Sequence, residues 1–199
     1  MTARLDARQD RLAAKGRERR IPGEEGVWVL IFGDLVIFAV VFATFLHYRG
    51  EDVETYNRSA LDLTQGFGLV NTLVLLTSSL LVVLAVRALP TNGTGASRLF
   101  AGALGLGGVF CVVKAVEYTG KLTAGITPGT NGFWMFFYVL TGLHLLHLLV
   151  GMGVLGLLVR LARKPLTAKR FAVLEGGACF WHMVDLLWIL LFPLLYLVR

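Results

Sequence analysis

The chain has few charged residues and very few cysteines, and each shortage excludes a class of protein. Only 16% of its 199 residues are charged, against 56% that are hydrophobic, so little of the chain can form a water-exposed domain. Both cysteines, Cys111 and Cys179, fall inside apolar segments, which argues against a disulfide framework. With four histidines and no Cys-x-x-Cys motif, the chain also has few side chains that could hold a metal or a haem.

Long apolar runs dominate the sequence instead. Five of them reach the roughly 20 residues that a helix needs to cross a bilayer. These runs lie at about 27–47, 67–89, 99–119, 133–160 and 172–197. Residues 1–26 are polar and basic, and we interpret them as an uncleaved arm because the next apolar run is too long for a signal peptide. The sequence therefore predicts an all-α, polytopic membrane protein, with an arm at 1–26 and a five-helix domain at 27–199.

The net charge of +6 follows from basic residues gathered on one side of the expected membrane. The arm, the connection after the second span and the connection at 160–171 together carry fourteen of the nineteen lysines and arginines. The other side, which includes the acidic connection at 48–66, carries four. Because cytoplasmic connections carry the basic excess, the N-terminus is predicted to be cytoplasmic and the C-terminus exposed outside. The charge thus indicates topology, and we expect no nucleic-acid partner.

The last span carries ionisable residues at a depth where such groups are costly and need partners. His182 and Asp185 lie three residues apart, and therefore on one helix face, between Trp181 and Trp188. Glu175 lies two turns before His182 on the same face. The simplest interpretation is that His182 and Asp185 tie this helix to its neighbours.

Two further polar pairs lie in the third and fourth spans. Lys114 and Glu117 are one turn apart near the outer edge, where we expect an ion pair with Lys114 reaching outward to water. His144 and His147 provide two ligands, fewer than a metal requires, so we expect them to form hydrogen bonds between helices. The predicted structural polar network, with no catalytic or metal-binding member, comprises Lys114, Glu117, His144, His147, Glu175, His182 and Asp185.

Asp34 lies seven residues into the first span, among apolar residues such as Phe38 and Phe42. A carboxyl group there either packs through hydrogen bonds or handles protons. The sequence favours the packing role, because a proton path usually needs a chain of such groups, but both roles remain open.

Four segments resemble motifs of haem–copper oxidase subunit III. Residues 181–188 (Trp-His-Met-Val-Asp-Leu-Leu-Trp) are similar to its Trp-His-Phe-Val-Asp-x-x-Trp signature, and residues 142–147 to its Gly-Phe-His-x-x-His segment. Residues 114–118 resemble its segment ending in Glu-Tyr, and residues 71–79 its Asn-Thr-x-x-Leu-x-x-Ser stretch. The resemblance covers about residues 25–198.

The sequence also departs from that family in two respects. Asp34 stands where the family commonly has a glutamate, the carboxylate associated with carbodiimide labelling, and its side chain is one methylene shorter. The chain has five spans where the mitochondrial type has seven. Among five-span members, residues 25–28 and 179–185 are most similar to the nitric oxide reductase-associated, NorE-type branch.

The resemblance implies an accessory, non-catalytic subunit of a respiratory complex in the bacterial inner membrane. Its partner would be the catalytic subunit of a haem–copper oxidase or a nitric oxide reductase, which would carry the haem and metal, while this chain would hold no redox cofactor. The family also binds phospholipid in a cleft, for which Trp28, Phe38 and Phe42 are the candidates, and Asp34 is the candidate for proton uptake.

Two other classes of protein remain as alternatives. A free-standing membrane protein could bind haem or quinone through His144 and His182, provided that these residues come from facing helices. A small transporter could use Asp34 and Glu117, although the sequence lacks the internal repeat and broken helices typical of that class.

Overall fold

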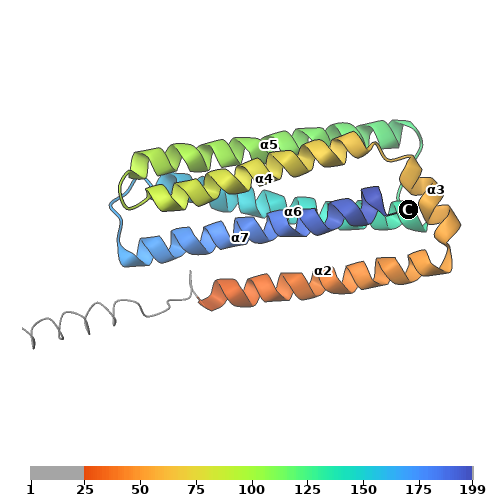
Figure 1. Cartoon of the computed structure of the whole chain (residues 1–199), viewed down its shortest axis with the longest axis horizontal. Coiled ribbons are helices and arrows are strands. Elements are labelled where there is room, and N and C mark those ends of the chain that lie inside the picture. The colour runs from red at the N-terminus through yellow and green to blue at the C-terminus, as the bar shows by residue number, and fades with distance from the viewer. Residues whose placement is uncertain (1–24, 199) are drawn as a thin grey trace, which may run out of the picture.

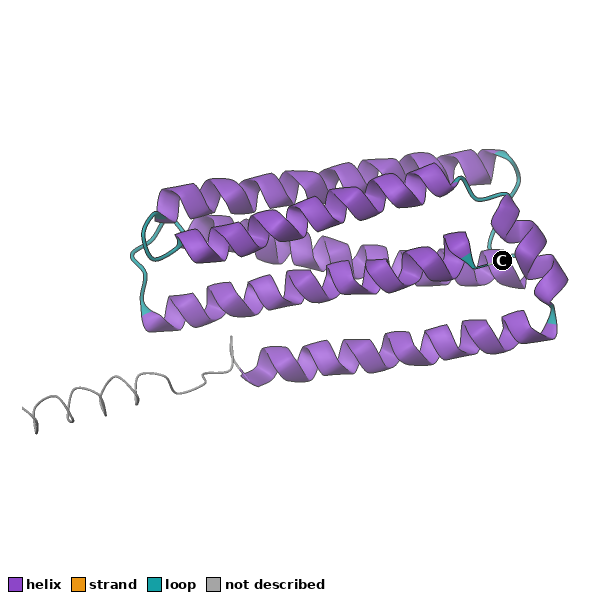
Figure 2. Cartoon of the chain, in the orientation of Figure 1, coloured by secondary structure: helices purple, strands orange, loops and turns teal. Residues whose placement is uncertain are grey.

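A computed structural model of the chain describes residues 25–198, within which every regular element is helical (Figures 1 and 2). Five helices are long and apolar enough to cross a membrane. They are α2 (Glu25–Glu51), α4 (Gln65–Ala88), α5 (Gly93–Thr123), α6 (Gly132–Leu161) and α7 (Ala168–Phe192). The predicted five-span all-α fold is confirmed. The predicted arm lies outside the described residues, except that Glu25 and Gly26 belong to α2.

Four of the long helices form a closed bundle and the fifth lies against its side. Helices α4, α5, α6 and α7 each pack on the next, and α7 returns to pack on α4. Helix α2 contacts only one side of this bundle, at α6 and α7, and Figure 1 shows it running beside α7, on the side away from α4. The seam between α2 and the bundle is therefore a natural place for a groove.

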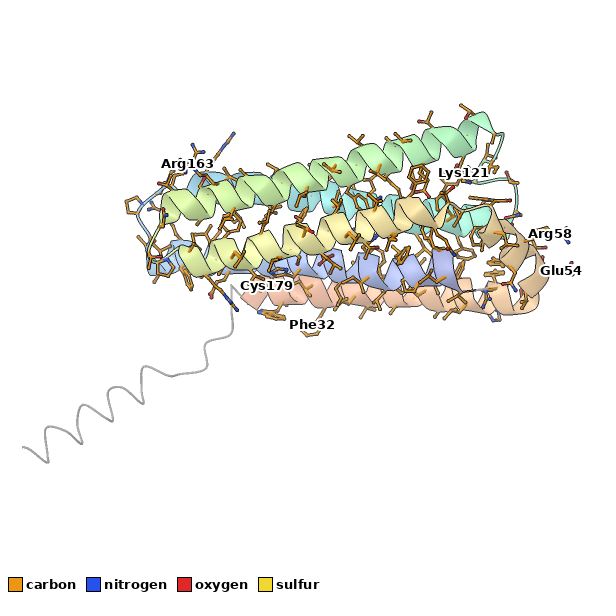
Figure 3. The ribbon with its side chains drawn as sticks, turned by 45° about the horizontal axis from the view of Figure 1, so that its top comes forward. Phe32, Glu54, Arg58, Lys121, Arg163 and Cys179 are labelled. Carbon is orange, nitrogen blue, oxygen red and sulfur yellow. The ribbon has the colours of Figure 1, made fainter. Side chains whose placement is uncertain are left out.

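The outer surface of the bundle has the distribution of side chains that a membrane favours. Large apolar residues such as Phe32 and Val36 are exposed along α2, at 61% and 63%. Charged residues gather toward the two ends, where Figure 3 labels Arg163 at one end and Glu54 and Arg58 at the other. A lateral apolar belt between two charged ends matches a helix bundle in lipid.

The connection at 48–66 contains a helix that the hydropathy pattern did not predict. Helix α3 (Val53–Leu61) begins after Asp52, whose side chain accepts a hydrogen bond from the Thr55 backbone N–H at 3.2 Å. Such a cap satisfies one of the free N–H groups of the first turn. Tyr56 and Ala60 are buried against the bundle. Only half of this short helix is apolar, so a search for membrane-length runs passes over it.

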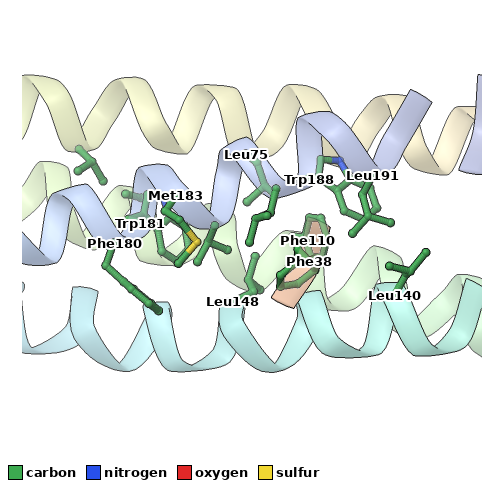
Figure 4. Packing of buried hydrophobic residues seen from close by; sticks show 14 of the residues in the cluster. Phe38, Leu75, Phe110, Leu140, Leu148, Phe180, Trp181, Met183, Trp188 and Leu191 are labelled. Carbon is green, nitrogen blue, oxygen red and sulfur yellow. The ribbon is translucent and has the colours of Figure 1, made fainter. Parts of the chain in front are cut away.

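Aromatic side chains pack with leucines in the core (Figure 4), and glycines leave room for the largest rings. Trp181 and Trp188 of α7 are 1% and 0% exposed. A Cβ atom at Gly151 of α6 would come within 2.9 Å of the Trp181 ring. Small residues of this kind let membrane helices approach closely.

Helix α7 continues into a short π-helix that positions Tyr196. A five-residue π-helix, η1 (Pro193–Leu197), follows Phe192. Proline has no backbone N–H to continue the α-helical ladder, and wider turns of this kind are frequent at functional sites. Tyr196 is thereby buried at 1% exposure, and its backbone carbonyl accepts a hydrogen bond from the Gln65 side chain at 3.1 Å.

Candidate functional site

A buried ion pair and a tyrosine hydroxyl form a closed polar cluster in the core of the bundle. Lys114 Nζ lies 2.7 Å from Glu117 Oε2 and donates a hydrogen bond to Tyr196 Oη at 2.9 Å. Tyr196 Oη in turn donates to Glu117 Oε1 at 2.7 Å. Both charged side chains are 1% exposed. Each oxygen of the carboxylate therefore has a donor, which is the condition for a tolerable buried charge.

The predicted ion pair of Lys114 with Glu117 is confirmed, but the outward reach of Lys114 is wrong. The ammonium group lies over the rings of Phe137 and Trp188, each with its centroid 5.0 Å away. The sequence analysis ended the third span at residue 119, whereas α5 continues to Thr123. Lys114 is therefore deeper in the helix than expected and faces the core, where aromatic faces and a carboxylate replace water.

Asp34 has a partner on another helix. Its Oδ1 atom lies 3.3 Å from His147 Nε2, and both side chains are 17% exposed. The other ring nitrogen of His147, Nδ1, lies 2.8 Å from the backbone carbonyl of Leu143. The Phe38 ring packs edge-on against the imidazole at a centroid distance of 5.4 Å. This contact joins α2 to α6 in the hydrocarbon-facing part of the fold.

The hydrogen bonding of His147 defines what the pair can do chemically. A carbonyl oxygen only accepts hydrogen bonds, so Nδ1 must carry a proton and Nε2 is left to face the carboxyl group. A hydrogen bond between Nε2 and Oδ1 then requires one further proton, carried either by the imidazole or by the carboxyl group. The contact is therefore one at which a single proton can be shared, because without that proton two lone pairs would face each other.

An apolar groove lies along the seam of α2, near this pair. It has a volume of about 420 Å³ and is lined by Gly26, Val27 and Leu30 of α2 together with apolar residues and glycines of α6 and α7. A smaller hollow of about 210 Å³, lined by Asp34 and His147, shares Leu30 with it. The two hollows share Leu30, Val150 and Phe180 among their lining residues, and only the smaller one is lined by Asp34 and His147.

The predicted lipid-contact residues occupy other positions on α2. Phe38 is 1% exposed and covered by protein, with Phe42 packed edge-on at a centroid distance of 5.9 Å. Trp28 is half-buried, with its ring 6.2 Å from that of Phe32. None of these three predicted residues is among those that line the groove.

His144 does not form the hydrogen bond between helices that the sequence analysis expected. It is fully buried, and neither ring nitrogen has a partner among residues 25–198. Its ring packs against Phe110 at 5.6 Å and Trp188 at 5.2 Å between centroids. The expectation was wrong because one-turn spacing from His147 does not fix which neighbours a histidine meets. The two residues lie about 60° apart around the helix, so one faces the core and the other faces α2.

His182 and Glu175 lie on the opposite seam of α7, toward α4. His182 Nδ1 is 2.6 Å from the hydroxyl oxygen of Ser79 on α4, which confirms that His182 ties the last helix to a neighbour. Asp185 is 5% exposed and its Oδ1 atom has no partner within the described range. Glu175 lines the same groove as His182, in agreement with the shared face predicted for the two.

The seven predicted polar residues therefore belong to separate groups rather than to one network. A haem held by His144 and His182 does not fit the geometry, because one imidazole packs on Phe110 and Trp188 in the core while the other contacts α4. Residues 25–198 also contain no set of three or more His, Cys, Asp or Glu side chains arranged to hold a metal.

Sequence reasoning missed Tyr196 and Ser79, the neutral partners of the charged groups. Ser79 lay in a segment already singled out for its resemblance. Tyr196 lies at the end of the last span, where its position predicts an aromatic side chain at the membrane interface and gives no sign of a buried partner.

Comparisons with known proteins give a consistent result. The family model for cytochrome c oxidase subunit III matches residues 23–198. The chain is 32% identical over 182 residues to cytochrome c oxidase subunit 3 of Bacillus subtilis, covering 87% of this chain and 84% of that protein. It is 30% identical over 181 residues to cytochrome bo(3) ubiquinol oxidase subunit 3 of Pseudomonas aeruginosa, covering 87% and 83%. Identity to cytochrome c oxidase subunit 3 of Corynebacterium diphtheriae is 28% over 197 residues, covering 97% and 95%.

The match to the family model spans all five membrane helices and every polar group described above. Together with a relative at 32% identity that aligns over most of both chains, it shows that the chain belongs to the cytochrome c oxidase subunit III family.

Proposed function

We propose that this chain is an accessory subunit of a haem–copper-type respiratory complex in the bacterial inner membrane, and that it supports proton uptake by the catalytic subunit. Its catalytic partner, rather than this chain, carries the haem and metal. The observation that carries the proton-uptake role is the contact between Asp34 and His147, a carboxyl group and an imidazole that line a hollow beside α2.

Two features of the pair support proton handling over simple packing. The groups are 17% exposed, so they are neither sealed in the core nor free in solvent. Asp34 also lies in the first half of α2 (Glu25–Glu51), nearer the end that the basic residues assign to the cytoplasm. Protons enter a respiratory complex from that side, so the pair is suitably placed to collect them.

The groove itself suits a lipid acyl chain. Its walls are aliphatic, aromatic or glycine residues, and a groove without polar groups offers a head group nothing to bind. A lipid chain seated there would fill the seam between α2 and the bundle, where protein contacts are few. The subunit would thus stabilise the complex through both its own packing and the lipid it retains.

A more specific proposal concerns the electron acceptor of the complex, which is either oxygen or nitric oxide. The NorE-like segments at 25–28 and 179–185 favour a nitric oxide reductase, whereas the relatives named above are oxidase subunits. The tagged chain can be purified in mild detergent, and the large membrane subunit that co-purifies with it can be identified. The identity of that subunit decides between these partners. A purified chain that carries stoichiometric haem and no partner would instead favour the free-standing haem protein.

The proton role is tested with Asp34→Asn in the assembled complex. Asparagine keeps the volume and a hydrogen bond to His147 but cannot titrate, so we expect slower turnover at alkaline pH, where protons are scarce, with assembly intact. His147→Gln should give the same deficit, and the double variant no more than either single change, because both act through one proton.

The matched control is Glu54→Gln, which changes an exposed carboxylate on α3 at the other end of the bundle. It should leave the pH profile unchanged. Turnover of Asp34→Asn and His147→Gln equal to wild type from acid to alkaline pH, at matched subunit content, would reduce the pair to a packing contact.

A further inference from the structure

Two polar side chains inside the bundle have no hydrogen-bond partner within residues 25–198. Asn71 of α4 and His144 of α6 are both 0% exposed. Neither the amide atoms of Asn71 nor the ring nitrogens of His144 have a partner in that range. Burying a donor or an acceptor without a partner costs the full desolvation penalty of the group. Folded proteins therefore pair nearly all such groups, either with their own atoms or with ordered water.

Contacts between the helices place Asn71 and His144 at the same level of the bundle. The Ser78 hydroxyl donates a hydrogen bond to the Ala103 carbonyl of α5 at 2.9 Å. Asn71 lies two turns before Ser78 among the buried residues of α4. Because α5 runs in the opposite direction (Figure 1), Asn71 lies level with Phe110, two turns after Ala103. Phe110 in turn packs against His144, with 5.6 Å between the ring centroids.

Trp188 of α7 connects the two sides of this level. Its indole N–H donates to the hydroxyl of Thr72, the residue after Asn71, at 3.0 Å. Its ring centroid lies 5.2 Å from that of the His144 imidazole. Helices α4 and α6 stand diagonally in the bundle, since each packs on α5 and α7. Asn71 and His144 therefore face the interior from opposite sides, and they form no hydrogen bond with each other.

We propose that this level of the bundle holds an internal water site that bridges Asn71 to His144. Water matches both side chains, because the amide has two donor hydrogens and an acceptor oxygen, and a neutral imidazole has one donor and one acceptor. An internal water makes about three hydrogen bonds to buried polar groups, and these two residues offer four atoms. A metal ion is a poorer occupant, because residues 25–198 contain no set of three or more ligands.

The site belongs to the interior of the bundle rather than to its surface. Asn71 and His144 lie in the half of the bundle nearer α3, whereas Glu25, where the described chain begins, lies at the other end (Figure 1). Neither residue lines the hollow that contains Asp34 and His147. The water site therefore goes beyond the proposed function and does not depend on it. Its role is to link the diagonal helices α4 and α6 through the centre of the bundle.

The test is hydroxyl-radical footprinting by X-ray radiolysis of the full chain, purified with the subunits that accompany it, in isotopically labelled water. A bound water that is activated in place oxidises the side chains beside it, and mass spectrometry locates the added oxygen. We expect oxidation of Phe110 and Trp188, although both are 0% exposed. Phe100, which is also on α5 and 0% exposed, should stay unmodified. Absence of oxidation at both Phe110 and Trp188 would overturn the proposal without any variant.

Paired substitutions show whether the two residues share the water. Asn71→Leu and His144→Phe replace each side chain by an apolar one of similar size, and each should abolish the oxidation of Phe110. Each single variant leaves the other residue with incomplete hydrogen bonding, so the double variant should melt no lower than the less stable single variant. Thr77→Val, on the exposed face of α4, is the control and should leave the oxidation of Phe110 unchanged.

Two results of the paired substitutions would overturn the bridge. Losses of melting temperature that add in the double variant would mean that Asn71 and His144 have separate partners. A coupled loss in a chain whose Phe110 and Trp188 are never oxidised would mean that the two side chains bind each other directly.

Discussion

Single residues of this chain show how a charge is tolerated inside a membrane bundle. Lys114 has a carboxylate, a phenol and two aromatic faces around its ammonium group. Asp34 has one imidazole and partial exposure. The first arrangement gives both charged groups close partners and fixes them in place, whereas the second leaves a carboxyl group and an imidazole partly exposed. We therefore assign structure to the first and proton handling to the second.

Breaking the buried ion pair should cost more than removing it. Lys114→Met leaves the Glu117 carboxylate in the core with only Tyr196 as donor, and we expect a loss of about 3–5 kcal/mol, the usual effect of breaking a buried pair. The double variant Lys114→Met with Glu117→Gln should recover more than half of the loss. Thermal unfolding of the purified chain in detergent measures both. A double variant no more stable than the single one would contradict this account of the pair.

His182 should act through assembly rather than turnover. His182→Ala removes the 2.6 Å contact with the Ser79 hydroxyl and leaves that half-buried hydroxyl with Asp185 as a side-chain partner, so we expect the loss of one hydrogen bond, about 1 kcal/mol. Asp185→Ala removes a largely buried carboxyl group and should act in the same direction. We expect less folded chain or assembled complex, with electron transfer per complex unchanged. Normal assembly with abolished turnover would instead make this pair catalytic.

At the scale of helices, two helices can pack most closely where one of them has a glycine at the contact. Helices α6 and α7 come together at Gly151 and Gly177, where an added Cβ would lie 2.9 Å from Trp181 and from Leu158 and Val154. Neighbouring glycines such as Gly153 have open space around them. Only some of the glycines of these helices are therefore needed for packing, and the sequence does not distinguish them.

Two substitutions on one helix separate these two kinds of glycine. Gly151→Leu forces the Trp181 ring to move, and we expect a loss of roughly 1–3 kcal/mol, as for other overpacked cores. Gly153→Leu, two residues away and exposed, should be nearly neutral or slightly stabilising, because leucine favours a helix over glycine. The melting temperatures of the two variants in the same detergent provide the comparison, and similar losses would mean that helix α6 is not held at Gly151.

At the scale of the whole molecule, the five helices bring the two described ends of the chain to opposite ends of the bundle (Figure 1). The basic excess then predicts which end is cytoplasmic. An alkaline phosphatase fused after Arg199 should be active in bacterial cells. The same enzyme fused within residues 162–167, between α6 and α7, should be inactive. Activity of that internal fusion would reverse the orientation.

The sequence by itself determined the number of spans, the helical class and the family. Each depends on local composition: an apolar run of membrane length must form a helix, because no other open structure satisfies its backbone in lipid. The Lys114–Glu117 pair was also predictable, since groups one turn apart meet on any helix. The amphipathic helix α3 was missed because it is short and half polar.

Only the tertiary structure decided which polar groups meet across helices. The pairing of Asp34 with His147 joins residues 113 positions apart, and that of Ser79 with His182 joins residues 103 apart. Such pairs depend on how each helix is rotated about its axis, and rotation is set by where aromatic rings fit beside glycines. Membrane hydropathy is nearly uniform around these helices, so the sequence pattern contains little information about rotation. His144 and His147 were indistinguishable in sequence for this reason, yet one is buried among aromatic rings and the other contacts Asp34 beside a groove.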